Sequence, residues 1–205
     1  MGREPKALGS AATSIWGLSK PDYPLLWASG FGFLFIALFW VNSLVGEQLA
    51  VVPDRIASVF LPAFVRVVAL LVAGAAGAAG IFLGSFLSGM LITGDAWHIS
   101  MAHAFLSTAG VWSAVCFCQW AFRQSPLELN WASIVAVGVL SSILNALVHG
   151  VFWASSFGEV RHIRELGWMV WGDLIGILLG FWILRLGLRL LRRAHSVWTR
   201  GETTQ

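Results

Sequence analysis

The hydrophobic positions of this 205-residue chain fall into long stretches that are separated by short polar segments. A helix needs about 20 apolar residues to cross the hydrocarbon core of a bilayer, at a rise of about 1.5 Å per residue. The pattern predicts an all-α membrane bundle over residues 24–192, between an N-terminal tail (1–23) and a C-terminal tail (193–205). Six transmembrane helices are expected, at residues 24–45, 58–74, 79–92, 100–122, 131–153 and 167–191.

The second apolar stretch decides the number of crossings. Residues 58–92 are too many for a single crossing of about 20 residues. The segment Gly74–Gly80 (GAAGAAG) is the natural place for a turn, because glycine tolerates backbone conformations that other residues avoid. We expect two tightly turned helices, and the sequence leaves open whether one of them is a re-entrant segment.

Composition agrees with a membrane protein, since 58% of the residues are hydrophobic and 11% are charged, against about 25% charged in soluble domains. The length leaves no room for a separate catalytic domain of roughly 100–150 residues. The chain carries no P-loop, zinc-protease or nucleophile-elbow motif. The net charge of +3 has its excess in the tails rather than in a nucleic-acid-binding patch. We therefore expect no enzymatic activity, no cofactor or metal, and no nucleic-acid partner.

The distribution of positive charges predicts the orientation. Cytoplasmic segments of membrane proteins are enriched in Lys and Arg. With six crossings both tails lie on one side, and that side holds nine basic residues: Arg3, Lys6, Lys20, Arg123, Arg185, Arg189, Arg192, Arg193 and Arg200. The opposite side holds Arg55, Arg161 and Arg164. Both tails are therefore predicted to be cytoplasmic, with the last arginines anchored in the negatively charged headgroup region.

Small residues recur every fourth position in two of the predicted helices. One row contains Gly80 and Gly84, and the other contains Gly172, Gly176 and Gly180. Such rows let two helix backbones approach closely inside a membrane. We expect both rows to be helix-packing faces.

A few polar residues fall inside the predicted helices, in the half of the bundle away from the tails. A buried charge costs at least a few kcal/mol in a membrane, so Arg66 and Asp173 are expected to pair. Asn145 and His149 are one turn apart on one helix face. One hypothesis is a structural ion pair with hydrogen bonds between helices. The other is a pocket, open to the outside, that holds a small ligand and is built from Arg66, His103, Asn145, His149, Trp168, Trp171 and Asp173.

Three short stretches resemble a known family. They are Phe60–Ala63 (FLPA), Ile81–Leu87 (IFLGSFL) and Trp171–Leu178 (WGDLIGIL). From about residue 60 onward the chain is similar to the membrane-associated sensor domain of the first described type, which usually precedes diguanylate cyclase or histidine kinase modules in bacterial signalling proteins. The resemblance implies a sensor module in a bacterial inner membrane. Because no output module follows Gln205, it also implies signalling to a separate membrane or cytoplasmic protein.

Two alternatives remain at this stage. The six short helices and the Trp-rich outer side are also similar to the substrate-binding subunit of energy-coupling-factor vitamin transporters, which docks on an energising module. The third possibility is a structural subunit of a larger membrane complex. All three have the lipid bilayer and a protein partner, and the first two add a small-molecule ligand.

Overall fold

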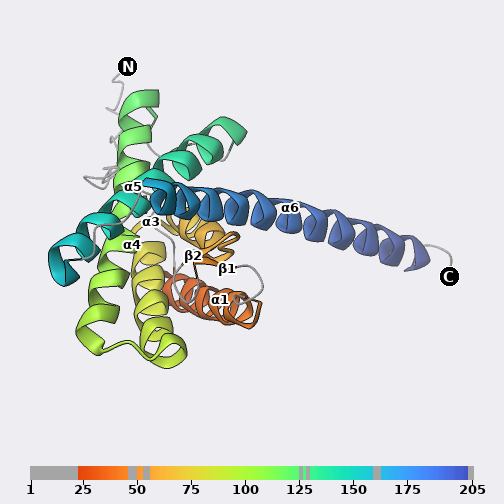
Figure 1. The fold of residues 1–205 in the computed structure, drawn as a ribbon. Helices are drawn as coiled ribbons and strands as arrows, with labels where there is room; N and C mark the ends of the chain where they lie inside the picture. The colour runs from red at the N-terminus through yellow and green to blue at the C-terminus, as the bar shows by residue number, and fades with distance from the viewer. Residues whose placement is uncertain are drawn as a thin grey trace, which may run out of the picture.

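A computed structural model describes residues 23–45, 50–52, 56–124, 127, 130–158 and 163–202. The predicted N-terminal tail lies outside this range except for Tyr23. Apart from two short strands, the regular elements are helices (Figure 1): α1 (Pro24–Leu44), β1 (Ala50–Val52), β2 (Ile56–Ala57), α3 (Pro62–Ser88), the π-helix η1 (Gly89–Thr93), α4 (Trp97–Phe122), α5 (Trp131–Phe157) and α6 (Ile163–Glu202).

In the described part of the chain, five helices are long and apolar enough to cross a membrane. They are Pro24–Leu44, Pro62–Thr93, Trp97–Phe122, Trp131–Phe157 and Ile163–Arg192. The chain is thus a multi-pass helical membrane protein. The difference from the six predicted helices arises in the second apolar stretch, where α3 and η1 count as one helix by length and composition, although the backbone breaks at Gly74.

A sharp break divides α3 at Gly74, whose φ of 52° and ψ of −123° are accessible to glycine. A Cβ atom at Gly77 would overlap the backbone of Ala69. In a straight helix these two residues would be about 12 Å apart along the axis, so the chain doubles back at Gly74. The same reversal brings Ile81 into one core cluster with Val65. We call residues 62–73 the first arm of α3 and residues 75–88 the second arm.

The predicted glycine row at Gly80 and Gly84 packs against α1. A Cβ at Gly80 would overlap the carbonyl of Ala28, and one at Gly84 would lie 2.8 Å from the carbonyl oxygen of Gly32. The packing role predicted for these glycines is confirmed. Since residue numbers rise together along this contact, α1 runs parallel to the second arm of α3.

The other end of α1 meets the start of α3. The Asn42 Oδ1 atom accepts a hydrogen bond from the Leu61 backbone N–H over 3.1 Å. This amide precedes the first turn of α3, where no preceding helical carbonyl is available to accept from it. The bond therefore fixes the first arm antiparallel to α1.

Helices α4 and α5 form an antiparallel pair. The connection begins with Arg123 in the left-handed conformation (φ 53°) and ends at Asn130, whose side chain accepts from the Ser133 N–H over 2.9 Å as a helix N-cap. Gly110 of α4 lies 3.5 Å, measured from a hypothetical Cβ, from the backbone nitrogen of Asn145 on α5. Close backbone approach at this crossing leaves little room for side chains between the two helices.

The second glycine row packs α6 onto the start of α3. The Gly172 carbonyl accepts from the Phe60 N–H over 2.9 Å, a Cβ at Gly176 would overlap the Phe60 carbonyl, and one at Gly180 would overlap the Phe64 ring. The expected packing role of all three glycines is confirmed. On its other side α6 runs antiparallel to α5.

The last helix is longer than predicted. It begins at Ile163 and continues to Glu202, through residues that were expected to form a tail after residue 192. The segment contains no proline, the residue that most strongly breaks a helix, so the helix can continue through it. Figure 1 shows α6 projecting well beyond the other helices toward the C-terminus.

Replacing Gly80 with valine should weaken the α1–α3 packing. The added side chain meets backbone rather than a flexible side chain, and overpacking of this kind costs about 1–3 kcal/mol. The matched control is Gly30→Val, because Gly30 is exposed on α1 and nothing lies within 4 Å of its hypothetical Cβ. Thermal unfolding in detergent would measure both, and equal midpoints would contradict the packing.

Candidate functional site

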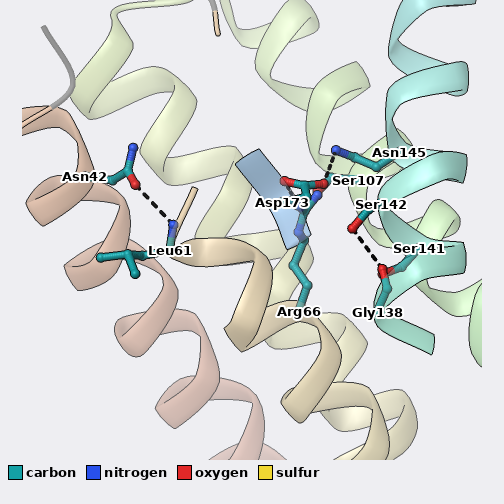
Figure 2. Close-up of polar contacts among 9 residues, drawn as sticks. All are labelled: Asn42, Leu61, Arg66, Ser107, Gly138, Ser141, Ser142, Asn145 and Asp173. Atoms are coloured by element: carbon teal, nitrogen blue, oxygen red, sulfur yellow. Dashed lines mark hydrogen bonds and ion pairs between the residues drawn. The ribbon is translucent and has the colours of Figure 1, made fainter. Parts of the chain in front are cut away.

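A buried ion pair lies at the centre of the bundle. Nη2 of Arg66, on the first arm of α3, donates to Oδ1 of Asp173 on α6 over 2.8 Å (Figure 2). The two residues are only 5% and 4% exposed. The pair expected from the sequence is therefore present, and it joins segments 107 residues apart in the chain.

Two further helices contribute hydrogen bonds to this pair. Nδ2 of Asn145 on α5 donates to the second oxygen of Asp173, Oδ2, over 2.9 Å. Nη1 of Arg66 donates to Oγ of Ser107 on α4 over 2.9 Å. The guanidinium also lies 5.3 Å from the centroid of the Phe60 ring, within the range of a cation–π contact. We call Arg66, Ser107, Asn145 and Asp173 the charge network.

The charge network binds four helices together because each member has a bonded partner on a different helix. Removing one partner of a buried ion pair leaves an uncompensated charge and costs about 3–5 kcal/mol. The network therefore constrains how α3, α4, α5 and α6 can move relative to one another.

A layer of aromatic rings lies one helical turn away from the network. The His103 ring packs against the rings of His149, Phe152 and Trp153, with centroid distances of 5.2, 5.3 and 5.4 Å. His103 precedes Ser107 by four residues on α4, and His149 follows Asn145 by four residues on α5. The two histidines predicted from the sequence are therefore brought together beside the charge network.

Two polar atoms of this region are buried without a hydrogen-bond partner in the described part of the structure. They are Oδ1 of Asn145 and Nε2 of His103. The Asn145 residue is only 7% exposed. A buried polar atom without a partner costs about 1–3 kcal/mol, so each of these atoms has an unused capacity for a hydrogen bond.

The two predicted tryptophans do not join the network. Trp168 is 38% exposed and Trp171 is 52% exposed on α6, whereas Asp173 on the same helix is buried. The prediction placed them in the pocket because of their depth along the helix. Depth does not determine which way a helical residue faces, and both rings lie on the exposed surface of α6.

Ser107 and Phe60 belong to this region but were not among the site residues predicted from the sequence. Ser107 could have been found from its position one turn after His103, since residues four apart share a helix face. Phe60 precedes α3, so helical spacing could not place its ring, although the residue opens the FLPA motif. In contrast, Ser141 and Ser142 donate to the Gly138 carbonyl of their own helix, over 3.0 and 2.8 Å (Figure 2).

A shallow groove of about 240 Å³ lies elsewhere, between α4 and the second arm of α3. None of the predicted ligand-binding residues lines it. Its walls are Phe82, Phe105, Thr108, Ala109, Trp112 and Ser113. The groove is therefore separate from the predicted site.

The residues of this region do not make a metal site in the described ranges, where no three His, Cys, Asp or Glu side chains gather. The rings around His103 contact it in T-shaped arrangements. Cys116 and Cys118 on α4 are free thiols.

No protein-family model, curated protein or solved structure matches this chain. The resemblance to the membrane-associated sensor domain therefore stays a prediction that rests on three short motifs. Two of these motifs are in contact, because Phe60 of the first bonds to Gly172 of the third. The third motif also contains Asp173.

A double-mutant cycle should reveal the coupling of the ion pair. We expect Arg66→Met and Asp173→Leu each to cost about 3–5 kcal/mol, because each leaves one buried charge unpaired. The double variant should cost clearly less than the sum, since neither charge is then present. Reversible unfolding in mixed detergent–SDS micelles measures all four proteins.

The control for this cycle is Ser141→Ala, whose hydroxyl bonds only within α5. Loss of this hydroxyl should cost about 0.5–1.5 kcal/mol, both in the wild type and in the double variant, because Ser141 contacts neither Arg66 nor Asp173. Strict additivity of Arg66→Met and Asp173→Leu would show that the two charges do not stabilise each other.

Proposed function

We propose that this protein is a sensor-like membrane module that binds a small ligand between α4, α5 and α6 and signals to a separate protein. The observation that carries the proposal is the pair of unpartnered buried atoms, Asn145 Oδ1 and His103 Nε2. A network with a purely structural role is expected to satisfy its buried polar atoms. Here the two charges are paired, but Oδ1 of Asn145 within the charge network and Nε2 of His103 beside it have no partner among the described residues.

The helix directions support a site that opens on the outer side. The two arms of α3 and the four other long helices alternate in direction, so the C-terminal end of α6 points to the side on which α1 begins. The arginine-rich end of α6 then marks the cytoplasmic side by the positive-inside rule. His103 near the start of α4 and His149 near the end of α5 belong to the opposite side.

The chemistry of the region narrows the ligand class. Asn145 Oδ1 accepts a hydrogen bond, and a neutral histidine Nε2 can accept or donate one. The rings of Phe152 and Trp153 add apolar walls beside His103. Arg66 and Asp173 neutralise each other, so the ligand need carry no net charge. A small neutral molecule with a planar apolar part and an N–H or O–H donor fits these groups.

A route for the signal follows from the position of Asp173. Asn145 bonds to the Asp173 carboxylate over 2.9 Å, and Asp173 lies on the helix that continues to Glu202. A ligand that donates a hydrogen bond to Oδ1 of Asn145 would reorient this amide and so change the bond from Nδ2 that holds α6 in place. The extended end of α6 would pass that change to a partner.

Ligand binding should appear as thermal stabilisation of the detergent-purified protein against a panel of vitamins, nucleosides and small aromatic metabolites. A ligand at about 100 times its dissociation constant stabilises the folded state by about 2.7 kcal/mol. We expect His103→Phe to retain the ring packing and the fold but to lose most of this shift, because it removes the unpartnered nitrogen. Stability without ligand should change little.

The matched control is Thr108→Val. Thr108 is also on α4 and its hydroxyl is also buried without a partner among the described residues, but it lines the separate groove. This variant should keep the full ligand shift. If no compound stabilises the wild type, or if both variants lose the shift equally, the site is wrong and a structural subunit becomes the better interpretation.

The proposed orientation has its own test. Green fluorescent protein fused after Gln205 should fluoresce, and alkaline phosphatase inserted after Gly158, at the far end of α5, should be active. The reason is the excess of arginine at the end of α6. Exchanging the two reporters serves as the control. Active phosphatase at the C-terminal fusion would reverse the orientation.

A further inference from the structure

The C-terminal part of α6 extends beyond the other helices of the bundle (Figure 1). Its 40 residues correspond to about 60 Å, roughly twice the hydrocarbon thickness of a bilayer. The last ring contacts with the bundle are made by Phe181, with Phe64 at 5.0 Å and with Trp131 at 6.3 Å. From Trp182 to Arg192 every residue except Gly187 is exposed.

Gly187 divides this exposed part. A Cβ at Gly187 would meet nothing within 4 Å, whereas one at Gly176 or Gly180 would overlap α3 or its preceding residue. Close packing therefore explains the earlier glycines but not Gly187. Glycine weakens a helix by about 1 kcal/mol relative to alanine, so the helix is most easily bent here, just after it leaves the bundle. We call residues 188–202 the basic arm.

The basic arm is amphipathic. At about 100° per residue, Arg189 and Arg192 share one face, while Leu188, Leu190 and Leu191 lie on the rest of the circumference. The three leucines are 47%, 55% and 68% exposed. In the sequence the same period continues with Arg193 and Arg200 at the basic positions and with Val197 and Trp198 at the apolar ones.

Charge decides which surface this arm fits. The sequence contains no acidic residue between Leu174 and Gly201. Within the arm, the arginines of the basic face therefore face a single acidic residue, Glu202, at the last position. A polar face rich in Lys and Arg, with Leu and Trp on the opposite side, is typical of helices that lie in the membrane interface. A helix partner would instead favour a narrow stripe of two positions in seven, and that stripe would place His195 among the contact residues.

We propose that the basic arm bends at Gly187 and lies on the membrane surface, with its leucines at the acyl boundary and its arginines on the phosphates of anionic lipids. The straight helix cannot cross the bilayer and lie along it, so the bend is required. The inference depends on the membrane-spanning bundle but not on the proposed ligand site. The arm would thus be a lipid-controlled element at the end of the helix that carries Asp173.

Nitroxide accessibility of the full-length protein in vesicles tests this inference. Cys116→Ala and Cys118→Ala provide the background, and single labels are placed at Leu190→Cys on the apolar face and at Arg189→Cys on the basic face. The vesicles contain phosphatidylcholine alone or with 30% phosphatidylglycerol. We expect the label at position 190 to be exposed to oxygen and shielded from a water-soluble relaxant in the anionic vesicles, and to be shielded less in the neutral ones. The label at position 189 should stay accessible to water in both.

Variants that remove an arginine of the basic arm, or the glycine at which the helix bends, complete the test. Each of Arg192→Gln, Arg193→Gln and Arg200→Gln should lower the ratio of membrane-bound to free arm about fivefold in anionic vesicles. Gly187→Ala should also lower it, with Gly30→Ala as the matched control. The inference is overturned if position 190 is equally exposed to water in both vesicle types. Spin–spin broadening that is independent of anionic lipid would also overturn it, in favour of pairing with a second copy. No ligand is added, so these results are independent of the ligand site.

Discussion

The requirement that two opposite charges meet inside an apolar bundle determines much of this structure. Neither Arg66 nor Asp173 is tolerable alone at that depth, since an unpaired charge in a membrane costs at least a few kcal/mol. The start of α3 and the first third of α6 must therefore lie side by side. Gly176 permits this because its lack of a side chain lets α6 approach the Phe60 carbonyl. The charge pair and the glycine row are thus two parts of one contact.

The hydrogen bonds of Asp173 couple the positions of several helices. Asp173 uses one carboxylate oxygen for Arg66 and the other for Asn145, so α3, α5 and α6 share one carboxylate. Tightly packed helices have few intermediate arrangements. A change in one of these bonds is therefore more easily absorbed by a movement of α6, which extends beyond the bundle, than by rearrangement of the packed core. In the proposed function, this would connect the unpartnered Oδ1 of Asn145 with the far end of α6.

The sequence predicted how far along each helix a residue lies. It predicted only in part which face of the helix that residue occupies. The apolar lengths predict a membrane bundle, and the cost of buried charge predicts the Arg66–Asp173 pair. Four-residue spacing correctly identified the packing glycines, because that spacing fixes a face. Trp168 and Trp171 were predicted from depth alone and face outward. The reversal at Gly74 lies within the predicted break, but its φ and ψ depend on tertiary contacts that a GAAGAAG pattern does not specify.

The spacing of four residues also explains why a second layer of polar side chains lies beside the charge network. Ser107 and Asn145 are each tied to a charge, which fixes the rotation of α4 and α5. Because His103 and His149 are one turn away on the same helices, this rotation turns their rings toward each other, at a centroid distance of 5.2 Å. The ion pair therefore positions a second polar layer that it does not itself satisfy. The helix rotations that the ion pair fixes also hold His103 and His149 in place. The proposed binding site therefore lies next to the Arg66–Asp173 pair.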